Sequence, residues 1–141
     1  MPVSKAVSRV TQSLLDDERT LLQESQRVDA STKAVLMRLA NERPRFAEEL
    51  ERLNGQGSRE SWGALVRELG RALLTRMPRR NMGEAVATCC RSQRRTEAHY
   101  GRALRFDLES EVKAVLISQQ VRLRAAGAEL AQLAPRPVSR S

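Results

Sequence analysis

Five polar residues interrupt otherwise apolar helical patterns, and they are the residues of this chain best placed to carry chemistry. They are Glu18, Glu24, Arg43, Gln93 and Gln119. Each falls near the middle of a segment with helical periodicity. Carboxylates that meet inside a helical bundle can hold metal ions, and buried amides or cations can hold a polar ligand. The sequence therefore predicts a polar layer across the centre of a bundle.

A pair of metal ions in such a layer needs more ligands than this chain supplies. A di-iron site takes a Glu from each of two helices and a Glu-x-x-His from each of the other two. The one histidine, His99, has Thr96 three residues before it, so the chain contains no Glu-x-x-His. Arg43 stands where the second helix would need a ligand, and residues 119–127 contain no Asp, Glu, His or Cys. We therefore exclude a standard di-iron oxidase and expect neither a metal nor another cofactor.

Three interpretations of the polar layer remain open. Its residues lie at the edge of the apolar seam in contact with water, or they form a buried hydrogen-bonded network that fixes the register of the helices, or they line a functional pocket. In the second case, Glu18 or Glu24 pairs with Arg43. Gln93 and Gln119 then form hydrogen bonds nearby, because a buried polar group without a partner is costly.

Two further groups of residues offer weaker alternatives. Cys89 and Cys90 are neighbours on a helix and point about 100° apart, so they are poorly placed to form a disulfide with each other. We expect free thiols, buried or half-buried. A redox or metal role for these cysteines with His99 is a further alternative. His99 lies nine residues beyond Cys90, about 13 Å along a helix, so the two cannot share one metal ion within a subunit.

The chain carries a formal net charge of +8 that is concentrated in one region. Residues 76–105 contain eight basic residues and two acidic ones. Binding of nucleic acid or another polyanion is the alternative that this patch suggests, although no aromatic residues are interleaved with the arginines for stacking on single strands. The candidate residues are Arg91, Arg94, Arg95, Arg102 and Arg105.

The helical patterns predict an all-α fold with a single domain over residues 1–134 and a disordered tail over 135–141. Pro44 falls inside the second segment, but the apolar seam stays in register across it, so we predict a kink rather than an end. Asn54 and the glycines after it end that segment. The predicted helices span residues 4–28, 58–76, 83–105 and 110–133, with one more that Asp29 or Ser31 caps and that continues to about residue 53.

Connections of short, long and short length predict two antiparallel hairpins joined by a long crossover, which carries the short helix 58–76. An internal repeat agrees with two hairpins. Residues 33–36 (Lys-Ala-Val-Leu) recur as 113–116, and the pair Glu-Leu at 49–50 recurs at 129–130 without a gap. One long crossover between two hairpins is the ferritin-like topology.

Four stretches, in this order and spacing, resemble an uncharacterised ferritin-like domain that is widespread in proteobacteria. They are residues 39–50, 62–67, 100–104 and 111–114, followed by Gln119. The resemblance implies a four-helix bundle with an extra helix in the crossover, and it implies no established activity. Cys90 and Gln93 stand where the family pattern has acidic residues, and Gly127 stands where it has a histidine, whereas Glu18 remains.

These observations favour a non-catalytic structural or interaction protein that has lost a di-iron site. We expect it to form a dimer or bind another protein, with Trp62 and Leu69 of the crossover helix supplying an apolar stripe. A metal- or redox-linked stress protein is a second alternative to polyanion binding. We find no phosphate-binding loop and no catalytic triad. A cytoplasmic location is expected, because no apolar run approaches about 18 residues and the N-terminus lacks a hydrophobic signal core.

Overall fold

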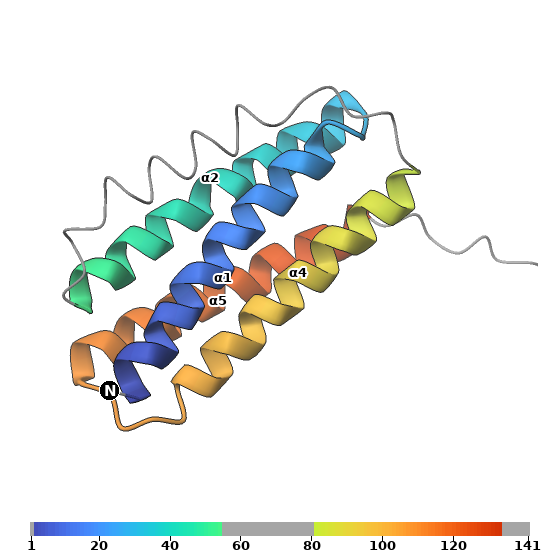
Figure 1. Cartoon of the computed structure of the whole chain (residues 1–141). Helices are drawn as coiled ribbons and strands as arrows, with labels where there is room; N and C mark the ends of the chain where they lie inside the picture. The colour runs from blue at the N-terminus through green and yellow to red at the C-terminus, as the bar shows by residue number, and fades with distance from the viewer. Residues whose placement is uncertain (1, 55–80, 134–141) are drawn as a thin grey trace, which may run out of the picture.

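The computed structural model describes residues 2–54 and 81–133, with side chains from Lys5 onward. These residues form four helices (Figure 1), which confirms the four long helices that the sequence predicts. The predicted helix over 58–76 and the tail over 135–141 lie outside the described residues. The helices are α1 (Pro2–Ser25), α2 (Ala30–Leu53), α4 (Met82–Ala103) and α5 (Ser110–Leu133).

The four helices pack side by side as a bundle, and each contacts two neighbours. α1 packs against α2 and α4, and α5 packs against the same two helices. Figure 1 shows α1 and α5 running in one direction and α2 and α4 in the other. Every neighbouring pair is therefore antiparallel. The end of α2 and the start of α4 lie at opposite ends of the bundle, so residues 55–80 join points that are a full helix length apart.

Local sequence accounts for where the helices begin and end. Asp29 caps α2, because its carboxylate accepts a hydrogen bond from the Thr32 backbone N–H at 2.8 Å, and Asn81 caps α4 in the same way through Gly83. α2 continues through Pro44 to Leu53, which confirms that the proline does not end the helix. α1 ends three residues earlier than predicted, because the backbone closes into a tight turn before Asp29.

The internal repeat extends to the buried faces of two helices. α2 and α5 have 24 residues each, and every buried residue of α5 lies 80 positions after a buried residue of α2. Both helices therefore present the same seam to the centre of the bundle. The matched pairs are Leu36 and Leu116, Leu39 and Gln119, Arg43 and Leu123, Phe46 and Ala126, and Leu50 and Leu130.

The core consists of two apolar clusters, one toward each end of the bundle. The first contains Val7 and Leu50, from the start of α1 and the end of α2. The second contains Leu21 and Leu36, from the other end of the same helices. Buried polar side chains of α1, α2 and α4 lie between the two clusters, whereas Gln119 of α5 lies between Leu116 and Leu123 of the first cluster. None of the helices in the described part of the chain is long and apolar enough to cross a lipid bilayer.

Candidate functional site

Arg43 lies at the centre of the polar layer and links three helices. Its side chain comes from α2, is 1% exposed and is among the largest fully buried side chains of the described residues. The guanidinium donates a hydrogen bond from Nη2 to Oε1 of Gln93 on α4, at 2.5 Å. Its Nε lies 3.8 Å from Oδ2 of Asp17 on α1. Burial lowers the pKa of Arg43, but a guanidinium titrates so high that it stays charged.

Asp17 is the carboxylate that faces Arg43. It is 2% exposed, and its Oδ1 accepts a hydrogen bond from the Ser92 hydroxyl of α4. Burial raises the pKa of Asp17 from 3.8 to about 6, and this effect outweighs the lowering by Ser92, Thr96 and Arg43. The hydroxyl groups of Ser13 and Thr96 join α1 to α4 at 2.7 Å beside it. Folding therefore holds a carboxylate in surroundings that favour its neutral form.

Gln93 extends the network to the fourth helix. While its Oε1 accepts from Arg43, its Nε2 donates to the backbone carbonyl of Leu123 on α5. Gly127 of α5 lies beside this side chain, and a Cβ at that position would lie 3.4 Å from Cγ of Gln93, at the short end of ordinary contact. Asp17, Arg43, Gln93 and a backbone carbonyl thus connect all four helices at one level.

A second buried group is built on Gln119. Its Oε1 accepts a hydrogen bond from the Tyr100 hydroxyl at 2.6 Å, and its Nε2 donates to Glu49 at 2.9 Å and to the Phe46 carbonyl at 3.2 Å. Tyr100 is fully buried, and burial raises the pKa of its phenol well above the ordinary value. The group is a hydrogen-bonded contact between α2, α4 and α5.

We expect the Gln119→Leu variant to lower the free energy of unfolding by about 1–3 kcal/mol, because the buried Tyr100 hydroxyl loses its acceptor. Urea denaturation followed by circular dichroism measures the change. Gln120→Leu is the matched control, since Gln120 is the next residue of α5 and is only half-buried. Equal stability of the two variants would show that the buried hydrogen bonds contribute nothing.

All five residues predicted for the polar layer are buried, which contradicts the interpretation that they lie in water at the edge of the seam. The predicted pairing is wrong, however: the carboxylate beside Arg43 belongs to Asp17, not to Glu18 or Glu24. Glu24 instead lies 3.9 Å from Arg27, one turn along α1. Gln93 and Gln119 occupy separate hydrogen-bonded groups.

The spacing of the apolar residues in α1 indicates that Asp17 faces the centre of the bundle. The residue falls three positions after Leu14 and four before Leu21, both of which are buried, so it continues the inward-facing pattern of α1. Glu24 also continues this pattern. The choice between them depends on which residue lies level with Arg43, and that level is set by the packing of α1 on α2.

The residues of the layer do not fit a di-iron centre. Around Arg43 they provide one carboxylate, three hydroxyl groups, an amide and a permanent cation, whereas such a centre needs several carboxylates and histidines. Within residues 5–54 and 81–133, no three residues of the types His, Cys, Asp and Glu gather closely enough to hold a metal ion. Cys89 is buried, and burial raises the pKa of its thiol to about 12, which makes it a poor nucleophile. Cys90 is half-buried.

The five arginines predicted to bind a polyanion are all exposed, but they do not form one surface. Arg102 and Arg105 line a cavity between α1 and α4, whereas Arg94 lines another cavity between α4 and α5. Arg91 donates a hydrogen bond to Thr88 on its own helix.

Comparisons of this chain with protein-family models, curated proteins and solved structures found no match. The resemblance noted in the sequence therefore stays a prediction. Function has to be inferred from the contacts of the described residues.

Proposed function

We propose that this protein is a ferritin-like bundle that acts by association rather than by catalysis, with an ion-paired polar layer in place of a di-iron centre. The observation that carries the proposal is the position of Arg43, buried between Asp17 and Gln93. A guanidinium there neutralises the carboxylate and repels a divalent cation. In this proposal the contacts of the layer fix the register of the four helices.

The arrangement of the helices supports the ferritin-like part of this proposal. α2 and α4 run in the same direction (Figure 1), as they must when a long crossover joins two antiparallel hairpins. The seam that repeats at an interval of 80 residues in α2 and α5 agrees with two hairpins related by a pseudo-twofold axis.

We expect no saturable binding of Fe(II), Mn(II) or Zn(II) to the core of the purified protein. Anaerobic calorimetric titration measures this, with the melting temperature followed in parallel. Binding of two Fe(II) ions per chain that is lost in the Asp17→Asn variant would contradict the proposal. Weak binding that the Asp17→Asn variant retains would come from the surface and leave the core assignment intact.

The outer face of α5 is the described surface best suited to association. Ile117 and Val121 are 44% and 63% exposed, and they lie on the side of the helix opposite to its buried seam. Ala114, Ala125 and Ala128 extend this face and are exposed as well. A helix that is apolar on both sides is normally covered on both sides. The predicted stripe with Trp62 and Leu69 lies outside the described residues.

The occupant that fits this face is a second copy of the chain. If two α5 helices pack antiparallel about Val121, the exposed Ile117 and Val121 side chains of both copies are covered at the twofold axis. The small alanine side chains allow the two backbones to approach closely.

We expect a dimer in solution that the Val121→Arg substitution converts to a monomer, because the substitution places two guanidinium groups against each other at the twofold axis. Size-exclusion chromatography with light scattering measures the mass. Met37→Arg is the matched control, since Met37 is also an exposed apolar residue but lies on α2. A wild-type monomer, or a Val121→Arg variant that stays dimeric, would overturn this assignment.

A further inference from the structure

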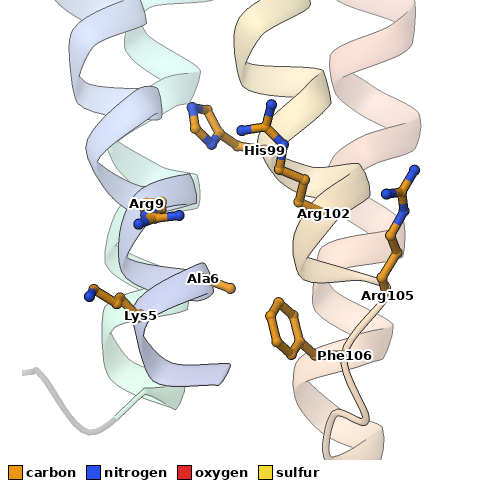
Figure 2. A pocket seen from close by; sticks show the side chains of 7 residues that line it. All are labelled: Lys5, Ala6, Arg9, His99, Arg102, Arg105 and Phe106. Atoms are coloured by element: carbon orange, nitrogen blue, oxygen red, sulfur yellow. The ribbon is translucent and has the colours of Figure 1, made fainter. Parts of the chain in front are cut away.

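A cavity of about 380 Å³ lies between the start of α1 and the end of α4 (Figure 2). Its size is within the usual range for small-molecule sites. Figure 2 shows the Phe106 ring and the Ala6 methyl group in the space between the two helices, with His99 and Arg102 farther along α4. The residues that matter for the inference are Lys5, Arg9, His99, Arg102, Arg105 and Phe106.

The charge that lines this cavity is uncompensated. Lys5, Arg9, Arg102 and Arg105 are exposed cations, and no acidic residue is among the lining residues. Among the described residues, none of these four cations forms an ion pair within 4 Å, whereas exposed Arg38 does so with Glu129. In Figure 2 the side chains of Lys5 and Arg105 extend away from the space between α1 and α4. Arg9 and Arg102 are the lining cations whose charges act on His99, and they give the hollow a positive potential that attracts an anion.

The positive potential affects the titration of His99, which also lines the cavity. The pKa of its imidazole is lowered, first by burial and then by the charges of Arg102, Arg9 and Arg95, against a weaker opposing effect of Asp16. A doubly charged anion among these cations would reverse the electrostatic part of that effect.

The aromatic wall of the cavity adds a second kind of contact. Phe106 is 41% exposed, and a tight turn after α4 places it there: the backbone N–H groups of Arg105 and Phe106 donate to the carbonyls of Arg102 and Ala103. The exposed ring face is a surface on which another flat ring can stack. A simple inorganic anion has no ring of its own and therefore cannot stack on Phe106.

We propose that this cavity binds a phosphate ester that carries an aromatic base, as a nucleotide does. The cations hold the phosphate, and Phe106 stacks on the base. The site goes beyond the association proposed above and shares no residue with the α5 face. It also gives the predicted polyanion-binding residue Arg102 a defined ligand, and it adds Arg9 and Phe106, which the sequence did not single out.

His99 makes the test direct, because it is the only histidine in the sequence, and its proton NMR signals are unambiguous once any affinity tag has been removed. AMP, adenosine, inorganic phosphate and an eight-residue oligo-dT are titrated at low salt. We expect saturable shifts of the His99 signals with AMP, binding at least about fivefold weaker for phosphate because stacking is lost, and no shift with adenosine. Tighter binding of oligo-dT than of AMP would support the same site and identify nucleic acid as the source of the ligand.

Variants separate a built site from general surface charge. The Arg9→Gln/Arg102→Gln variant is expected to weaken AMP binding by at least about tenfold, and Phe106→Leu to weaken binding of AMP but not of phosphate. Arg91→Gln/Arg94→Gln, which removes two exposed arginines that neither line the cavity nor act on His99, is the control and should bind normally. The proposal is overturned by the absence of His99 shifts, by equal binding of AMP and phosphate, or by equal losses in the two double-arginine variants.

Discussion

The Arg43→Met variant is expected to lose about 3 kcal/mol or more of unfolding free energy at pH 7, because it removes one partner of a buried ion pair. The loss has two sources. Asp17 keeps a buried carboxylate with no cation beside it, and the amide oxygen of Gln93 loses its buried donor. Methionine keeps much of the length of arginine, so the effect of an empty volume is small. Urea denaturation gives the free energy.

Arg45→Met is the matched control for this substitution. Arg45 lies two residues farther along α2 and is exposed, so its replacement should change the stability by no more than about 0.5 kcal/mol. The cost of Arg43→Met should also be smaller at pH 5 than at pH 7, because Asp17 is then protonated in the folded state. A loss below about 1 kcal/mol at pH 7 would show that the guanidinium is not held in the core as described.

The second large effect is the pH dependence that Asp17 confers. Its pKa is raised from 3.8 to about 6 by folding, so the folded state binds this proton more tightly than the unfolded state. The stability that this residue contributes is therefore fully present below about pH 4 and is lost as the pH rises through 6. We expect the wild type to lose about 2–3 kcal/mol relative to the Asp17→Asn variant between pH 4 and pH 7.

The comparison with Asp17→Asn matters because other groups titrate over the same range. Both proteins share these groups, so the difference between their unfolding free energies isolates residue 17. Asp16→Asn is a useful second control, since Asp16 is only half-buried and adjacent in sequence. A pH-independent difference between wild type and Asp17→Asn would mean that the carboxylate is not buried in the folded protein.

The sequence predicts the helices and the existence of the polar layer for simple physical reasons. Apolar residues at intervals of three and four define the buried faces, and Asp29, one of two candidate caps, marks where α2 begins. The seam also continues across Pro44, as the structure confirms. These features depend on residues close together in the chain.

The partners within the layer could not be predicted in the same way. Asp17, rather than Glu18 or Glu24, meets Arg43, because the packing of α1 sets the height and rotation of each carboxylate relative to α2. Gln93 reaches a backbone carbonyl of α5, and nothing in a sequence pattern marks such an acceptor.

The cavity beside Phe106 is still harder to predict from the sequence than the partners within the layer, because it depends on how the helices pack. Arg9 and Arg102 come together only because the start of α1 lies beside the end of α4 in an antiparallel pair. The sequence shows the arginines of α4 as a charged helix. It does not show that only two of the five predicted arginines join cations of α1 around a hollow.

A double-mutant cycle between Asp17 and Arg43 tests the central claim most directly. The four proteins are the wild type, Asp17→Asn, Arg43→Met and the double variant, all measured by urea denaturation at pH 7. If the two buried charges stabilise each other across the layer, Asp17→Asn raises the stability of the Arg43→Met background, and the coupling free energy is at least about 1.5 kcal/mol. Effects that add to within about 0.5 kcal/mol would contradict an ion-paired centre.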